Sequence, residues 1–252
     1  MYVGKLNIPY KSSVNFIILS DLHYGSNACD IDRFKKVVNK YLEDNYWFAL
    51  GDMLDSIITS DKRFDYRSCE VDDILTIADE LINILKPYSS NCLGYITGNH
   101  EEALRRKTQI DISQYIANML GVQYMGYSAY LLLRFYREHH SELWKLYLTH
   151  GSYSGAIRYG KIRKLESLAN IYDADIYICG HVHDLLYTDD MYYTLDNNGN
   201  LQEKHRYYII AGSYLKPFDN YVEYKGIKPS RLGSPILTVY PEKRKVDITF
   251  VP

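Results

Sequence analysis

The amino-acid sequence predicts an α/β protein in which two packed β-sheets carry helices on their outer faces. In the first half of the chain, short apolar runs alternate with amphipathic helical patterns, as in a parallel sheet built from right-handed crossovers. In the second half, apolar runs are paired across polar turns, which is typical of antiparallel strands. A third observation bears on function: five of the apolar runs end abruptly in Asp, Asn or His.

The first half contains three apolar runs of strand length, at 14–20, 46–50 and 93–97. Between them, residues 71–85 place their apolar side chains on one stripe at helical spacing, and residues 31–42 do so more weakly. The order strand, helix, strand, helix, strand predicts parallel neighbours whose carboxyl ends meet at one edge of a sheet.

The second half is expected to be richer in hairpins. Apolar runs pair at 129–136 with 143–149, at 185–195 with 205–211 and at 235–240 with 245–251. The middle pair flanks Asn197-Asn198-Gly199-Asn200, a strong hairpin signal. A basic helix is expected at roughly 160–172 and a strand at 175–179. No repeat or linker divides the chain, so we expect a single domain over residues 1–252.

Composition narrows the class of protein. Net charge is −2 and the isoelectric point is near 6.4, which excludes a global basic field for nucleic-acid binding. The four cysteines are scattered without a CxxC pair, which argues against a disulfide framework and a thiolate zinc site. No apolar run reaches the ~18 residues of a membrane span, and the N-terminus lacks the order of a signal peptide. We therefore expect a cytoplasmic protein with reduced thiols and no membrane partner.

Tyrosine is unusually frequent, at 27 of 252 residues. Tyrosine suits half-buried strand positions, and that use accounts for many tyrosines without a functional role. The alternative is a set of stacking platforms for nucleobases near the site. Composition alone leaves both interpretations open.

The polar ends of the five apolar runs form the candidate site. They read Asp21-Leu22-His23, Gly51-Asp52-Met53-Leu54-Asp55, Gly98-Asn99-His100-Glu101, His150-Gly151 and Gly180-His181-Val182-His183. Ligands of open α/β sheets gather outside the carboxyl ends of strands, so these residues can converge. Imidazole and carboxylate donors without thiolate suit Mn²⁺, Fe or Zn²⁺ in an open, catalytic arrangement. Seven such residues are too many for one ion with an open position and fit two ions that share a carboxylate.

The ordered set DxH, GDxxD, GNHE, HG and GHxH resembles the calcineurin-like metallophosphoesterase superfamily, including its phage and bacterial members, over about residues 15–185. The resemblance implies a four-layer αββα sandwich of two mixed β-sheets flanked by helices. It implies that a first ion binds Asp21, His23 and His183, that Asp52 bridges, and that a second ion binds Asn99, His150 and His181. It further implies that His100 is a catalytic histidine outside the ligand set and that Asp55 orients it.

The expected cofactors are two divalent metal ions, with Mn²⁺ favoured and Fe, Zn²⁺ or Ni as alternatives. Two cations roughly 3.5–4 Å apart can activate a bridging water and clamp phosphoryl oxygens. The resulting hydroxide attacks phosphorus, while His100 protonates the departing alkoxide or stabilises phosphoryl charge. Asp55 either raises the pKa of His100 or caps a helix, and the two roles are compatible. Glu101 either supports the site or complements a helix N-terminus.

The sequence specifies the substrate less closely than it specifies the metal ligands. Protein phosphatases of the superfamily carry arginines where this chain has Ser56 and Thr97, so the sequence favours phosphodiesters over phosphoproteins. We expect Asn99, His100 and Arg158 to contact the substrate. A nuclease acting on DNA or RNA is the alternative, and a non-catalytic scaffold is disfavoured because His100 and all seven ligand residues are present. The expected partner is thus a phosphodiester, a nucleotide or a nucleic acid.

Three further segments have open roles. Two are basic clusters that could attract a polyanion or form solvated helix faces: Arg158, Lys161, Arg163 and Lys164, and Arg105-Arg106-Lys107. The third, residues 213–234, is a long loop bearing Tyr and Lys that could cover the site.

Overall fold

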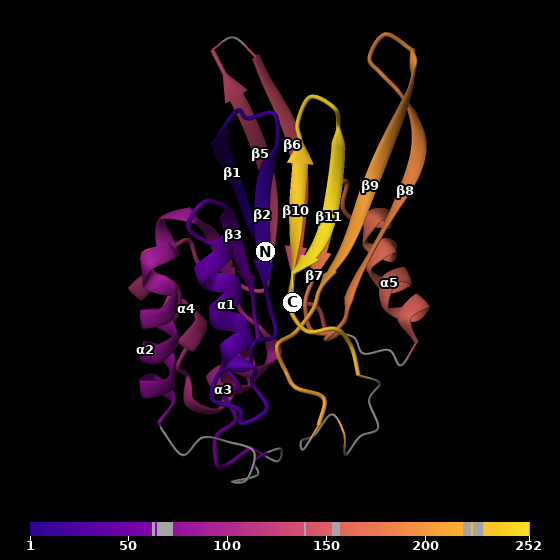
Figure 1. Ribbon diagram of the computed structural model, residues 1–252. Helices are drawn as coiled ribbons and strands as arrows, with labels where there is room; N and C mark the ends of the chain where they lie inside the picture. The colour runs from indigo at the N-terminus through magenta and orange to yellow at the C-terminus, as the bar shows by residue number, and fades with distance from the viewer. Residues whose placement is uncertain are drawn as a thin grey trace.

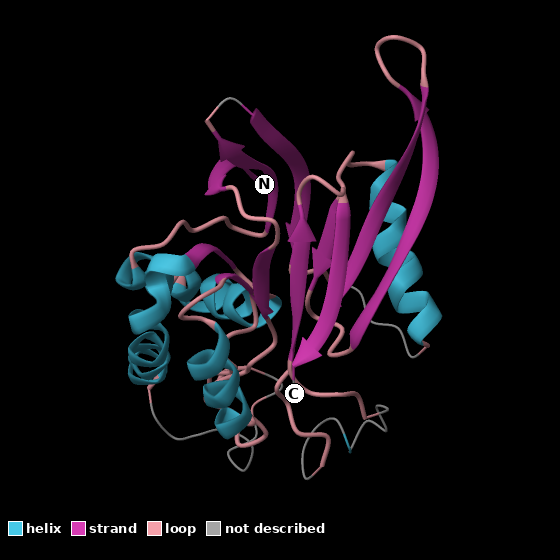
Figure 2. Ribbon diagram, turned by 45° about the horizontal axis from the view of Figure 1, so that its top comes forward, coloured by secondary structure: helices cyan, strands magenta, loops and turns pink. Residues whose placement is uncertain are grey.

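A computed structural model describes residues 1–61, 64, 73–138, 140–152, 157–218, 223 and 229–251. Two β-sheets pack face to face, with helices α1 to α4 over one outer face and α5 over the other (Figure 1). Turning the molecule shows the same two groups of helices on opposite sides of the strands (Figure 2). The expected αββα sandwich is confirmed.

The first sheet has five strands in the order β11-β10-β2-β3-β4. Their bounds are β2 (Val14–Leu19), β3 (Tyr46–Leu50), β4 (Cys92–Ile96), β10 (Ser234–Tyr240) and β11 (Lys245–Val251). Strands β2, β3 and β4 are parallel, and β10 adds to β2 in the antiparallel sense. The carboxyl ends of the three parallel strands therefore meet at one edge, as the sequence predicts.

Four helices cover this sheet: α1 (Ile31–Tyr41), α2 (Ile74–Leu85), α3 (Asn99–Thr108) and α4 (Ile112–Leu120). Asp30 and Asp73 cap α1 and α2, since their carboxylates accept backbone N–H groups of the first turns. The predicted helix over 71–85 is confirmed from Ile74 onward, while residues 71 and 72 lie outside the described residues. A 3₁₀ segment, η1 (Lys86–Asn91), leads into β4.

The second sheet has six strands in the order β1-β5-β6-β7-β9-β8. Their bounds are β1 (Tyr2–Pro9), β5 (Ser128–Arg137), β6 (His140–Thr149), β7 (Ile176–Cys179), β8 (Leu185–Leu195) and β9 (Leu201–Ala211). The three predicted antiparallel pairs are confirmed. Strand β1 is a difference: it pairs in parallel with β5, more than a hundred residues away, and sequence patterning did not reveal it.

Helix α5 (Arg158–Glu166) lies against the six-stranded sheet and is shorter than the expected helix over 160–172. The chain continues as a 3₁₀ segment, η2 (Ser167–Asn170). The Ser167 hydroxyl donates to the carbonyl of Lys164, and this side-chain bond competes with α-helical bonding where the helix ends.

Part of the tyrosine excess forms an aromatic ladder under α5. Tyr177 and Tyr208, on β7 and β9, stack with ring centroids 5.1 Å apart, and Tyr147 stacks on Tyr172 at 4.2 Å. Tyr177 and Tyr208 are buried, in the same apolar cluster as Leu165 of α5. These tyrosines therefore serve as packing residues of the sheet and are not available to stack on bases.

Among the described residues, no helix is both long and apolar enough to cross a membrane.

Candidate metal centre

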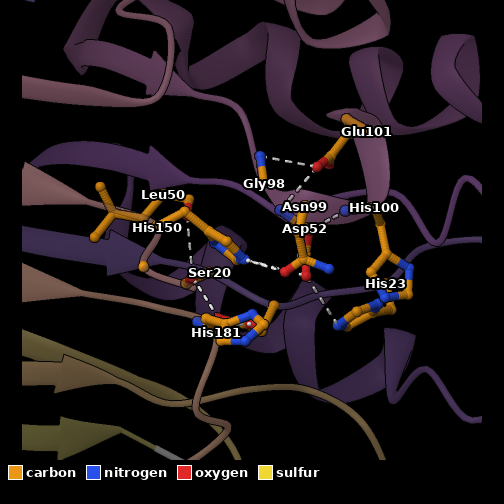
Figure 3. Close-up of polar contacts among 12 residues, drawn as sticks. Ser20, His23, Leu50, Asp52, Gly98, Asn99, His100, Glu101, His150 and His181 are labelled. Atoms are coloured by element: carbon orange, nitrogen blue, oxygen red, sulfur yellow. Dashed lines mark hydrogen bonds and ion pairs between the residues drawn. The ribbon is translucent and has the colours of Figure 1, made fainter. Parts of the chain in front are cut away.

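Five strand ends from both sheets converge on one site. Strands β2, β3 and β4 end at Leu19, Leu50 and Ile96, while β6 and β7 end at Thr149 and Cys179. The polar residues that follow each strand face one another (Figure 3). The sequence-predicted ligands are thus brought together by the ends of two different sheets.

Three groups of His and Asp among the described residues could each hold an ion. One contains Asp21, His23 and His183, a second contains Asp52, His150 and His181, and a third contains His23, Asp55 and His100. Within each group, one potential ligand atom per residue lies within 4.8 Å of the others. The first two groups contain His and Asp residues that the resemblance assigns to separate ions, and that assignment stays a prediction.

The first group is tightly assembled. His183 Nε2 lies 3.1 Å from Asp21 Oδ1 and 3.3 Å from His23 Nε2. The same His23 nitrogen lies 3.9 Å from Asp52 Oδ2. Asp52 therefore stands between the two groups, where a bridging carboxylate has to be.

The second group surrounds the other side of Asp52. His150 Nε2 lies 3.1 Å from Asp52 Oδ2. Burial opposes ionisation of Asp52, but His150 and His100 outweigh it and hold the pKa of this carboxyl well below its usual range. Asp52 is therefore an anion at the centre of the site.

Asn99 shows that the site fits a cation. The end of its amide that faces the site lies 2.6 Å from His181 Nδ1, 3.1 Å from His150 Nε2 and 3.2 Å from Asp52 Oδ2. An amide oxygen at this end faces the electron pairs of His181 Nδ1 and Asp52 Oδ2, and it is hydrogen-bonded only where His150 Nε2 carries a proton or where oxygen and nitrogen are exchanged. A cation shared with these atoms satisfies the oxygen without the swap.

Two of the imidazole rings are oriented by hydrogen bonds to the ring nitrogen that does not face the site. His150 Nδ1 lies 2.7 Å from the carbonyl oxygen of Leu50, to which it donates, so Nε2 is left to face the site. His23 Nδ1 lies 3.2 Å from Asp55 Oδ1, which leaves its Nε2 facing inward in the same way. Second-sphere hydrogen bonds of this kind fix the tautomer and ring orientation of metal-ligating histidines.

Protonation of the imidazoles varies across the site. Burial lowers the pKa of His23, assisted by His100, and burial likewise lowers the pKa of His181. These two rings are therefore neutral, as metal ligands must be. At His150 burial acts in the same direction, but Asp52 outweighs it and raises the pKa to about 10. An ion entering the second group would have to displace a proton from His150.

His100 lies in the third group, which shares His23 with the first. Its Nδ1 is 2.7 Å from the carbonyl oxygen of Asp55 and 3.2 Å from the Asp55 carboxylate. Burial opposes ionisation of Asp55, but hydrogen bonds from His100 and His23 outweigh it and lower the pKa of this carboxyl. Asp55 thus contacts both rings at Nδ1.

The backbone at the site is strained. Five of the candidate ligands have positive φ without being glycine: Asp21 (50°), His23 (51°), Asp52 (47°), His181 (67°) and His183 (49°). Each such residue costs on the order of 1–3 kcal/mol, and such residues persist where the surroundings over-determine them. The tight loops place two ligands of one loop on neighbouring positions of the site.

Glu101 is one of the surrounding groups that hold this geometry. Its buried carboxylate accepts the backbone N–H groups of Asp52, Leu54 and Gly98, each at 3.0 Å (Figure 3). The sequence left two roles open for Glu101. Its side chain caps the start of α3 and also binds the loop that carries Asp52, so the two roles coexist.

The basic clusters are largely paired with acids. Arg105 and Arg106 bind Glu102 at 2.7 Å, and Lys107 binds Asp61 at 2.8 Å. Arg158, expected to contact the substrate, lies 3.4 Å from Asp184, which Lys161 also contacts. Residues 153–156, between His150 and this helix, lie outside the described residues.

The loop at 213–234 contacts the backbone of two candidate ligand residues. Ser213 Oγ donates to the carbonyl of Asp21 at 3.0 Å, and Ser230 Oγ donates to the carbonyl of His183. Its described ends thus support two strained ligand residues. The part that was expected to cover the site includes residues 219–222 and 224–228, which lie outside the described residues.

Comparison with models of known protein families shows to which family this chain belongs. A family model described as calcineurin-like phosphoesterase matches residues 14–185, which include all five polar strand ends. The chain belongs to the calcineurin-like phosphoesterase family. No match was found among curated protein sequences.

Several solved structures are similar to this phosphoesterase-family chain at low identity. A predicted phosphoesterase from Streptococcus pneumoniae is 14% identical with a TM-score of 0.40, covering 96% of this chain and 91% of the other. Vps29 from Entamoeba histolytica complexed with Zn²⁺ is 12% identical with a TM-score of 0.43, covering 94% and 98%. Vps29 from Chaetomium thermophilum is 14% identical with a TM-score of 0.42, covering 89% and 78%.

Proposed function

We propose that this chain is a dinuclear-metal-dependent phosphoesterase that hydrolyses phosphodiesters. The observation that carries the proposal is the pair of ligand groups on either side of Asp52, with Asn99 presenting an amide end to the second group. Two divalent cations held there would supply an activated water and neutralise charge on the phosphoryl oxygens. Mn²⁺ is the metal we would test first, with Fe, Zn²⁺ and Ni as alternatives.

The residues of the chain take the remaining roles in this proposal. Asp21, His23 and His183 would hold the first ion, Asn99, His150 and His181 would hold the second, and Asp52 would be shared between them. His100, whose Nδ1 is held by Asp55, carries a proton on Nε2 and delivers it to the leaving oxygen. Asp55, which keeps its charge, orients His100 and stabilises its protonated form.

The side chains at two positions favour a diester over a phosphoprotein. Ser56 and Thr97 occupy the places where protein phosphatases of the family have arginine, and both are buried. The Thr97 hydroxyl accepts a hydrogen bond from Ser113 at 2.8 Å, so it is engaged in the core. A phosphate monoester carries a second negative charge, and no bidentate arginine stands at either position to receive it.

A nuclease is the second candidate, and charge pairing in the described residues weakens it. Four of the cations first considered as a rim for a polyanion, Arg105, Arg106, Lys107 and Lys161, are bound to Glu102, Asp61 or Asp184. Binding along a nucleic-acid backbone relies on cations that can neutralise phosphates. The described surface therefore favours a small diester.

A panel of substrates with added Mn²⁺ tests the proposal. It should contain bis-p-nitrophenyl phosphate, p-nitrophenyl phosphate, cyclic nucleotides, mononucleotides, and single- and double-stranded DNA and RNA. We expect kcat/KM for the bis ester to exceed that for the monoester by at least about tenfold, the equivalent of 1.4 kcal/mol in transition-state stabilisation. Faster hydrolysis of the monoester would refute the diester assignment, and processive cutting of nucleic acid would favour the nuclease.

A further inference from the structure

The loop that carries His181 and His183 is attached to helix α5 by a lysine outside the five motifs. Lys161 Nζ donates to the carbonyl of Val182 at 3.2 Å and to Asp184 Oδ2 at 3.3 Å. Its side chain is only 13% exposed, so it is not a solvated surface charge. We propose that Lys161 is a positioning residue that holds this loop in the geometry needed by both ions.

The loop requires such support because its backbone is unfavourable. His181 and His183 both have positive φ, at 67° and 49°. Val182 lies between them with its carbonyl on Lys161 and its buried side chain in the apolar cluster that includes Leu165 of α5. A side chain and a carbonyl of one residue are thus both anchored to the same helix.

Asp184 adds an ion pair to the attachment between this loop and α5. Its side chain is 5% exposed, and a buried carboxylate needs a cation or hydrogen bonds to remain charged. Lys161 lies 3.3 Å and Arg158 3.4 Å from its two oxygens, but the Arg158 side chain is 57% exposed. Since solvent screens Arg158, Lys161 is the principal partner. The carbonyl of Asp184 is held separately by the N–H of Gly212 at 3.0 Å.

The consequence reaches both ions because the loop serves both groups. His183 belongs to the group with Asp21, and His181 belongs to the group with Asp52. A shift of this loop therefore changes one imidazole ligand of each ion at once. This inference rests on the proposed dinuclear site.

The test measures metal binding directly, without catalysis. Mn²⁺ and, separately, Zn²⁺ are titrated calorimetrically into metal-stripped wild type, Lys161→Met, Asp184→Asn and the double variant. We expect Lys161→Met to weaken binding of both ions by roughly 10–100-fold, the range typical when a second-sphere partner is lost. Lys35→Met, the same change at an exposed lysine of α1, is the matched control and should bind as wild type.

The double variant tests the route through Asp184. If Lys161 acts through this carboxylate, the double variant should lose much less than the product of the two single losses, because both changes break one contact. If the loss of metal affinity in the double variant equalled the product of the two single losses, the proposed coupling between Lys161 and Asp184 would be overturned. Thermal melting of each metal-stripped variant shows whether it is folded, and Asp184→Asn carries the test should Lys161→Met fail to fold.

The outcomes separate this inference from the proposed function. Wild type that binds two ions, together with Lys161→Met that binds them equally well, would overturn the positioning role and leave the phosphoesterase proposal standing. Wild type that binds neither Mn²⁺ nor Zn²⁺ would overturn both.

Discussion

The two sheets contribute chemically different halves of the site. The five-stranded sheet provides both carboxylates, Asp21 and Asp52, together with Asn99, His23 and His100. The six-stranded sheet provides imidazoles only, from His150, His181 and His183. The groups Asp21-His23-His183 and Asp52-His150-His181 each draw on both sheets, so both proposed ions depend on how the two sheets pack together.

The halves are also supported in different ways. On the five-stranded side, the Asp52 loop is bonded to the buried carboxylate of Glu101 through backbone N–H groups. On the six-stranded side, the histidine loop is bonded to the side chain of Lys161 on α5. Both loops are thus bonded to a side chain of an outer-layer helix, Glu101 on α3 and Lys161 on α5, but Glu101 is buried and accepts three backbone N–H groups, whereas Lys161 is partly exposed. We expect changes on the anionic side to have the larger effects.

Replacing the central carboxylate should have the largest effect. Asp52→Asn removes the charge that lies between the two groups, so we expect loss of the second ion, weakened binding of the first, and a fall in kcat of at least about 10³-fold. Metal content by mass spectrometry and bis-p-nitrophenyl phosphate hydrolysis measure both effects. His181→Ala, which alters only one group, should retain more of the first ion, and equal losses in the two variants would contradict a bridging role.

His100 should separate chemistry from metal binding. Since His100 belongs to neither of the two groups proposed to bind the ions, His100→Ala should keep near-wild-type metal content and reduce kcat by about 10²–10⁴-fold, the usual contribution of a general acid. A diester with a better leaving group needs less protonation and should lose less. Unchanged kcat for both leaving groups would show that His100 is not the acid.

Much of this arrangement was predictable because it depends on local pattern. Apolar runs that stop at Asp21, Asp52, Asn99 and His150 marked both the strands and the site, and the family match over residues 14–185 includes them all. The close spacing of ligands in each loop was visible as well. The positive φ of the ligands was not, because Asp and His adopt that conformation more often than most residues but still only in a small minority of cases.

The missed features depend on contacts between distant segments. Strand β1 is recognised only by its parallel pairing with β5, and residues 2–9 contain Gly4 and Pro9, which weaken a strand signal. The pairing of Lys161 with Asp184 joins residues 23 positions apart, so the sequence showed two unrelated charges. The basic clusters were read as solvated or polyanion-binding for the same reason.

Replacing Glu101 should have an intermediate effect, and it tests how the Asp52 loop on the five-stranded side is supported. Glu101→Gln places an amide N–H₂ against backbone donors that the carboxylate now accepts, leaving a buried donor unsatisfied. We expect a loss of about 1–3 kcal/mol in the free energy of unfolding, measured by urea denaturation of metal-free protein. If stability falls while metal affinity is unchanged, Glu101 supports the fold without positioning Asp52.

A surface ion pair on the same side should have the smallest effect. Hydrogen bonds, first of all from Arg105, outweigh burial and lower the pKa of Glu102 to about 2. A carboxyl whose pKa is lowered on folding stabilises the protein above its unfolded value and loses that contribution as pH falls. Glu102→Gln should therefore cost about 1 kcal/mol near pH 7, and the difference from wild type should shrink below about pH 4.5.

Denaturation of Glu102→Gln over a range of pH measures this, with Glu43→Gln at an exposed position as control. Glu102 pairs with Arg105 and Arg106 within α3 and accepts a hydrogen bond from Tyr127 outside the helix, and it has no contact with a ligand residue among its described bonds. If its loss weakened metal binding as much as Glu101→Gln, the rigidity of the five-stranded side would come from the position of the whole helix. If metal binding stayed intact, the buried backbone bonds of Glu101 would be what holds Asp52.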